Sequence, residues 1–183
     1  MARLYLVRHG EPAGTWADSH DPGLTELGRQ QAQVVADRLR LVHPKQIVTS
    51  PLRRAVETAM PLSFALSMQP LVVQQVAEIP TPAHMTLAHR GEWLRTIMAR
   101  TWSQTDPELR RWRDAIVDGL TRLQVDTAIY SHFVAINVAL GASIGDDRVT
   151  CFMPAHASVT VLETNGRAVS LVELGQTAET KVT

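Results

Sequence analysis

Cysteine is nearly absent from this sequence of 183 residues, and none of its apolar runs is long. The single cysteine, Cys151, cannot form a disulfide within the chain, which excludes a disulfide-stabilised scaffold. The longest mostly apolar stretch, residues 133–144, carries Asn137 and is too short to span a membrane. The apolar run at residues 4–7 is also too short for the core of a signal peptide. We therefore expect a soluble, cytoplasmic protein with no membrane partner.

An excess of charge of one sign is absent as well, and lysine is scarce. Eighteen basic residues balance eighteen acidic ones, so the formal net charge is zero. A general nucleic-acid or membrane-surface binder normally carries a basic excess, and we therefore expect no nucleic-acid partner. Only Lys45 and Lys181 are lysines, and the other sixteen basic residues are arginines. Arginine is the forked partner of phosphate and carboxylate groups, so the positions of individual arginines carry the information.

Strand-like and helix-like apolar spacing alternate along most of the chain. The predicted strands are residues 3–7, 45–49, 71–76 and 126–130, with a hairpin within 157–174; the predicted helices are residues 24–42, 50–66 and 133–140. Ser50 is the expected N-cap of the second helix. This alternation favours a three-layer α/β/α sandwich, with a mainly parallel sheet and at least one antiparallel strand. We expect one domain over residues 1–183, with a small helical cap inserted at about residues 80–123.

Chemically active side chains follow each predicted parallel strand. Ligands of such sheets bind beyond the carboxyl ends of the strands, so these side chains should converge. The residues that follow the strands are Arg8, His9, Gly10 and Glu11 after the first, Arg53 and Arg54 after the second, Glu78 after the third and His132 after the fourth.

This set of side chains suits phosphoryl transfer. Arginine forks and helix N-termini bind phosphate oxygens. A neutral imidazole can attack phosphorus, and nearby positive charge favours the neutral form. A carboxylic acid can protonate a departing alkoxide. The sequence has no paired-cysteine zinc pattern, no paired carboxylates for two-metal catalysis and no phosphate-binding P-loop, so we expect no metal and no cofactor.

Four segments, in order, resemble those of the histidine phosphatase superfamily, the phosphoglycerate-mutase-like enzymes. They are LYLVRHGE at residues 4–11, LTELGRQQA at 24–32, TSPLRRAVETA at 49–59 and YSH at 130–132. The resemblance implies that His9 is a nucleophile that becomes phosphohistidine. It implies that Arg8, Arg54 and His132 hold the phosphoryl group, and that Glu78 is the proton donor. Members of the family need no metal.

The resemblance also orders the remaining candidates. Arg54 matches better than Arg53, because the family motif places its arginine directly before the alanine. Glu11 is the reserve proton donor. Thr15 stands where many members carry asparagine, and Phe133 stands where glycine is common, so both are expected at the substrate pocket.

The implied activity is hydrolysis of a phosphomonoester, with a small phosphorylated molecule as the expected substrate. Three alternatives stay open: a phosphoglycerate-type mutase, a protein phosphohistidine phosphatase and a non-catalytic phosphate-binding module. The insertion looks short for a mutase, and its presence favours a small substrate. His156 is a further candidate pocket residue whose role is open, as is the oligomeric state.

Overall fold

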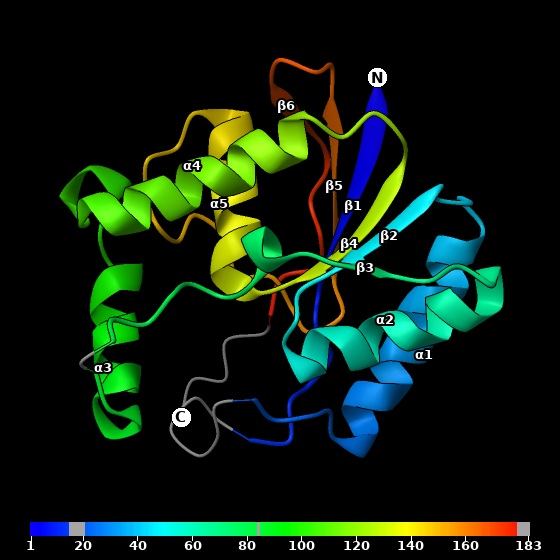
Figure 1. The fold of residues 1–183 in the computed structure, drawn as a ribbon, viewed down its shortest axis with the longest axis horizontal. Coiled ribbons are helices and arrows are strands. Elements are labelled where there is room, and N and C mark those ends of the chain that lie inside the picture. Colours follow the sequence, from blue (N-terminus) through cyan, green and yellow to red (C-terminus); the bar gives the residue numbers. More distant parts are fainter. Residues whose placement is uncertain (15–20, 84, 179–183) are drawn as a thin grey trace.

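The computed structural model describes residues 1–14, 21–83 and 85–178. Strands and helices alternate along this part of the chain (Figure 1). The elements are β1 (Ala2–Arg8), α1 (Glu26–Arg40), β2 (Gln46–Thr49), α2 (Arg53–Leu66), β3 (Leu71–Val72), α3 (Leu87–Met98), α4 (Pro107–Thr121), β4 (Thr127–Ser131), α5 (Phe133–Ile144), β5 (Val159–Thr164) and β6 (Val169–Glu173). Within the described ranges, no helix is both long and apolar enough to cross a membrane.

One sheet has the strand order β3-β2-β4-β1-β5-β6. The pairs β3–β2, β2–β4 and β4–β1 are parallel, whereas β5 is antiparallel to both of its neighbours, β1 and β6. The predicted mainly parallel sheet with an antiparallel strand in the terminal hairpin is therefore confirmed. Because β2, β4 and β1 are adjacent and parallel, their carboxyl ends lie at one edge of the sheet.

Helices cover both faces of this sheet, with α1 and α2 on one side and α4 and α5 on the other (Figure 1). Alternate residues of each central strand belong to different apolar clusters. Leu4 and Leu6 of β1 pack toward α4 and α5, whereas Tyr5 and Val7 pack toward α1 and α2. A strand buried on both faces needs a continuous apolar run, which is why the sequence of β1 does not alternate with polar residues.

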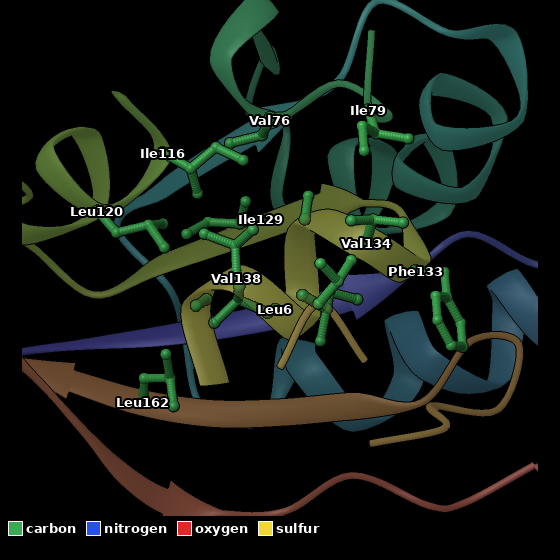
Figure 2. Close-up of a cluster of buried hydrophobic side chains, with 14 of the residues drawn as sticks. Leu6, Val76, Ile79, Ile116, Leu120, Ile129, Phe133, Val134, Val138 and Leu162 are labelled. Carbon is green, nitrogen blue, oxygen red and sulfur yellow. The ribbon is translucent and has the colours of Figure 1, made fainter. Parts of the chain in front are cut away.

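The helical segment predicted as a cap has two parts. Ile116 and Leu120 of α4 are buried in the same cluster as Ile129 and Leu162 of the sheet, and Figure 2 shows these four side chains together. Helix α4 is therefore part of one layer of the sandwich. Helix α3 lies beside that layer, at its margin (Figure 1).

Two local predictions are wrong. The strand predicted over residues 71–76 ends at Val72, and residues 74–76 form a 3₁₀ turn that buries Val76 in the core. The apolar residues at 71–76 therefore belong to a short edge strand and to a turn that packs on the core, not to one long edge strand. Ser50 does not cap α2, since Leu52 occupies the N-cap position and the Ser50 hydroxyl accepts a hydrogen bond from the Leu52 N–H at 3.2 Å.

The loop after β1 passes unusually close to the first turn of α1. A β-carbon on Gly28 would lie 2.2 Å from the carbonyl oxygen of Glu11, and one on Gly10 would lie 2.5 Å from that of Gly28. Neither distance is compatible with a side chain. Thr25 begins α1 here as the predicted N-cap, because its hydroxyl accepts a hydrogen bond from the Gly28 N–H at 2.9 Å. Glycine at positions 10 and 28 thus fixes the path of the chain directly after His9.

We predict that Gly28→Ala lowers the free energy of unfolding by about 1–3 kcal/mol, the usual cost of overpacking, because the backbone at Glu11 must move. Gly119→Ala is the matched control. Gly119 is an exposed residue of α4 and no atom lies within 4 Å of an added β-carbon, so this change should stabilise the protein by up to about 1 kcal/mol. Urea denaturation measures both effects, and equal stability of the two variants would contradict the close contact.

Candidate active site

The register of the sheet brings three chain segments to one edge. Val7 of β1 and Thr49 of β2 both pair with Tyr130 of β4. The residues that follow these positions therefore lie close together, and they include His9, Ser50 and His132. The predicted convergence of side chains at the carboxyl ends of the strands agrees with this register.

His9 is buried, with 4% of its surface exposed, and both of its ring nitrogens have partners. The Nδ1 atom lies 2.8 Å from the carbonyl oxygen of Gly10, so we assign the ring proton to Nδ1. The Nε2 atom accepts a hydrogen bond from Nε of Arg54 at 3.2 Å. Burial, and then the positive charge of Arg54, hold the pKa of His9 well below its usual value. The ring is therefore neutral at pH 7, with its Nε2 lone pair directed at the guanidinium.

Arg54 is held in this position by the first turns of α2. It is 2% exposed, and its carbonyl oxygen accepts a hydrogen bond from the Thr58 hydroxyl, which in turn accepts one from the Gly10 N–H at 2.9 Å. Thr58 thus ties α2 to the loop that carries His9. Arg53 points away, because its side chain is 66% exposed and pairs with Glu57 at 2.6 Å. The structure therefore brings Arg54, and not Arg53, to His9.

His132 is fully buried at the N-cap of α5, and its ring centroid lies 5.2 Å from that of His9. Its Nε2 atom lies 2.7 Å from the hydroxyl oxygen of Ser50. We assign the Ser50 hydroxyl as the donor to His132 Nε2, the tautomer that leaves Nδ1–H of His132 available to donate. Burial is the main reason that the pKa of His132 lies well below its usual value, with His9 and Arg54 adding to the effect.

Glu78 follows the 3₁₀ turn and is 6% exposed. Its Oε1 atom accepts a hydrogen bond from the Ile79 N–H at 3.0 Å. The segment before it is tied to the end of β4, because the Ser131 hydroxyl donates to the carbonyl oxygen of Val76 at 2.7 Å. Burial raises the pKa of Glu78, although the Ile79 N–H and the charges of Arg54 and Arg8 act in the opposite direction. A raised pKa favours the protonated acid.

Arg8 is half-buried and is held by two contacts. One terminal nitrogen donates to the carbonyl oxygen of Pro154 at 2.7 Å, and its guanidinium carbon lies 5.4 Å from the ring centroid of Phe133. Burial lowers the pKa of Arg8 to about 10, so the group stays charged at neutral pH. Phe133 is only 4% exposed, and the structure places it against Arg8 in an arrangement typical of cation–π pairs.

A cavity of about 530 Å³ opens beside His9 and is also lined by Arg8 and Arg54. Glu11 lies on its wall, where the carboxylate accepts a hydrogen bond from the Thr25 hydroxyl at 2.9 Å. His156 lies on the same wall. Thr15, the remaining predicted pocket residue, lies outside the described residues.

Three residues near this site were not identified by the sequence reasoning as parts of it. Ser50 orients His132, and Thr58 links Arg54 to the loop after β1. Arg54 and Thr58 are four residues apart on one helix face, and this spacing could have indicated the contact between them. Arg90 of α3 is 9% exposed and donates to the Thr81 hydroxyl at 2.8 Å. No local pattern distinguishes Arg90 from the other arginines of the chain.

Four of the buried polar atoms without a hydrogen-bond partner in the described part of the chain belong to predicted site residues. They are Nε of Arg8, a terminal nitrogen of Arg54, Nδ1 of His132 and Oε2 of Glu78. Buried polar atoms are normally paired, since each one left unpaired costs free energy. Three of the four are donors and two belong to cations, so the site is built to receive an anionic, oxygen-rich group.

The sequence model of one protein family, the histidine phosphatase superfamily (branch 1), matches residues 4–177. The chain belongs to this superfamily. The membership confirms the resemblance carried by the four sequence segments. Among the described residues, no three His, Cys, Asp or Glu side chains are placed so that they could hold a metal ion.

Two curated relatives are named for different activities. Phosphoserine phosphatase 1 of Hydrogenobacter thermophilus is 29% identical over 116 residues, which are 61% of this chain and 51% of that protein, so the match spans about half of the relative's length. Probable phosphoglycerate mutase GpmB of Yersinia pestis is 27% identical over 175 residues, covering 86% of this chain and 78% of that protein.

Solved structures share the fold at lower identity. The mycobacterial glucosyl-3-phosphoglycerate phosphatase has a TM-score of 0.74 at 22% identity and covers 97% of this chain and all of its own. Phosphoserine phosphatase from Entamoeba histolytica, in complex with 3-phosphoglyceric acid, has a TM-score of 0.75 at 20% identity. The match covers 97% of this chain and 98% of that structure's chain.

We predict that Arg54→Gln weakens the binding of inorganic phosphate roughly 10- to 100-fold, the value of one or two hydrogen bonds to a charged group. Arg53→Gln is the matched control and should bind phosphate like the wild type, because its side chain faces solvent. Isothermal titration calorimetry measures both affinities. An equal loss in the two variants would contradict the assignment of Arg54.

Proposed function

We propose that this protein is a metal-independent phosphatase that hydrolyses a small phosphomonoester through a phosphohistidine on His9. The observation that carries the proposal is the set of unpaired buried donors around a neutral His9, contributed by Arg8, Arg54 and His132. A phosphoryl group whose phosphorus lies near His9 Nε2 would satisfy these donors with its non-bridging oxygens. Positioning and charge stabilisation of this kind are the main source of catalysis in phosphoryl transfer.

In the first step, the Nε2 lone pair of His9 forms a bond to phosphorus as the bond from phosphorus to the leaving oxygen breaks. The leaving oxygen takes the proton of Glu78, whose raised pKa favours the protonated form. The imidazole of His9 gains positive charge, which the carbonyl oxygen of Gly10 stabilises through its hydrogen bond with Nδ1–H. Arg8 and Arg54 balance the negative charge on the phosphoryl oxygens.

In the second step, a water molecule attacks phosphorus from the side that the leaving group has vacated. The Glu78 carboxylate, which lost its proton in the first step, takes a proton from this water. The bond between phosphorus and Nε2 breaks, and His9 returns to the neutral form while inorganic phosphate is released. One carboxyl group thus acts first as acid and then as base.

The substrate we propose is a small phosphorylated metabolite. Relatives named for phosphoserine and for glucosyl-3-phosphoglycerate support this class, since both substrates are small phosphomonoesters. The match to a probable phosphoglycerate mutase favours the mutase as the second candidate. A mutase would return the phosphoryl group to a substrate hydroxyl and not to water. Assaying 3-phosphoglycerate for released phosphate against its isomer separates the two activities.

We predict that His9→Ala lowers turnover of an aryl phosphate roughly 10³-fold or more, because the covalent step loses its nucleophile. Rapid quenching in alkali should trap an acid-labile phosphoenzyme in the wild type and none in the variant. Near-normal hydrolysis by the variant would reject the mechanism. Phosphate binding by the wild type without formation of any phosphoenzyme would identify a non-catalytic binding module.

We predict that Glu78→Gln lowers hydrolysis of an alkyl phosphate roughly 10²-fold or more, and that of p-nitrophenyl phosphate much less, because nitrophenolate leaves without a proton. Glu11→Gln is the matched control and should show no such dependence on the leaving group. In the wild type, alkyl phosphate hydrolysis should decline as the pH rises through the raised pKa of Glu78, and this decline should be absent from the Gln variant. A leaving-group effect in Glu11→Gln would make Glu11 the donor.

A further inference from the structure

A third histidine, His156, flanks the nucleophile on the side opposite His132. Strand β1 lies between β4 and β5 in the sheet, and His132 follows β4 whereas His156 precedes β5. Val7 pairs with Val159, so the beginning of the antiparallel β5 lies at the same sheet edge as the end of β1. The ring centroid of His156 is 5.8 Å from that of His9. The nucleophile is therefore bracketed by two imidazoles from the two neighbouring strands.

The turn that carries His156 is tied to the residues before the nucleophile. The Ala157 N–H donates to the carbonyl oxygen of Arg8 at 3.0 Å, and the Arg8 N–H donates to that of Ser158 at 3.2 Å. The Arg8 guanidinium also holds the carbonyl oxygen of Pro154 at 2.7 Å. The Arg8 side chain and the His156 turn are thus positioned as one unit.

The backbone of this turn is strained. Ala157 has a φ of 54°, in the left-handed region that favours glycine, and the Ser158 N–H donates to the carbonyl oxygen of Ala155 across the turn. Residues held in such conformations cluster at functional sites, where the surrounding structure fixes them. Here the strained residue directly follows His156, and the backbone hydrogen bonds of the turn keep it in this conformation.

The His156 side chain faces the cavity and forms no hydrogen bond within the described residues. It lines the cavity together with Arg8, His9 and Arg54, and it also borders a neighbouring groove between α1 and residues 155–159. His9 and His132 each have a hydrogen-bonded ring nitrogen, but neither nitrogen of His156 has such a partner in this part of the chain. A half-buried imidazole with free donor and acceptor atoms beside a nucleophile is available to a ligand.

The charges around His156 come from several elements. Arg8 of β1 and Arg54 of α2 line the cavity with it, Arg38 of α1 lines the adjoining groove, and Glu11 is the acidic group on the same wall. Burial and then Arg8 lower the pKa of His156 to about 4, with Glu11 acting in the opposite direction. The ring is neutral at pH 7, so it can donate one hydrogen bond without adding charge to the free site.

We propose that His156 is a further substrate-binding residue, whose imidazole N–H donates a hydrogen bond to an oxygen of the phosphoryl group held by Arg8 and Arg54. This inference rests on the proposed function for the nature of its ligand. A bound phosphate dianion opposes the effect of Arg8, and the pKa of His156 should therefore rise as phosphate binds.

The direct test is nitrogen-15 NMR of the histidine rings during titration of the wild-type protein with inorganic phosphate. The His156 resonance, assigned by its loss in His156→Gln, should move on phosphate binding, and its pKa should rise by roughly 1 to 3. The exposed His43 and His89 serve as internal references and should not respond. Phosphate binding that leaves the His156 resonance and its pKa unchanged would overturn the proposal.

Variants provide the second readout. His156→Ala should weaken phosphate binding roughly 10-fold or more, and His156→Gln, which keeps a donor, should recover part of this affinity. The KM for p-nitrophenyl phosphate should rise more than kcat falls, and His89→Gln should leave both unchanged. Unaltered phosphate affinity in His156→Ala would overturn the proposal. Absence of a phosphoenzyme in the wild type would reject the proposed function instead, while a shifted His156 resonance would still establish the binding role.

Discussion

The site depends on two guanidinium groups beside a neutral histidine, that of Arg54, which is buried, and that of Arg8, which is half-buried. Burying a cation costs free energy unless it is paired, and no carboxylate forms an ion pair with Arg8 or Arg54 within the described residues. Arg54 donates instead to His9 Nε2, and Arg8 to the carbonyl oxygen of Pro154. Glu78 is a buried acid whose charge would act on both arginines, yet its raised pKa favours the protonated form. The site therefore keeps positive charge that an anionic ligand would neutralise, and such a ligand would stabilise the folded protein.

The hydroxyl groups that hold these side chains in place come from three different segments at the sheet edge. Thr58 of α2 bonds the loop after β1, Ser50 after β2 bonds His132, and Ser131 of β4 bonds the segment before Glu78. Each of these hydroxyls donates or accepts between two chain segments that are distant in sequence. The close approach of Gly10 and Gly28 adds a steric limit to the same loop. The geometry around His9 thus depends on short polar side chains as much as on the sheet.

The sequence predicted the layers, the parallel sheet and the terminal hairpin, because the apolar periods there are strong and the strands are buried on both faces. It predicted that Arg54 and not Arg53 faces the site, through a family motif that reflects the helix geometry of α2. It could not predict that Ser50 bonds His132, because a serine before a proline reads locally as a helix cap. Nor could it separate α4 from α3, since burial of Ile116 against the sheet depends on tertiary packing.

Arg90 illustrates what only the three-dimensional structure reveals. Its side chain is buried and, among the described residues, bonds one neutral group, the Thr81 hydroxyl; its charge acts on Glu78, Arg54 and His132. At Glu78 this charge lowers the pKa, whereas burial raises it. The strength of the proposed acid is therefore a balance between desolvation by the core and positive charge supplied partly by α3. Because Arg90 belongs to α3, a change that moves α3 would alter the readiness of Glu78 to give up its proton.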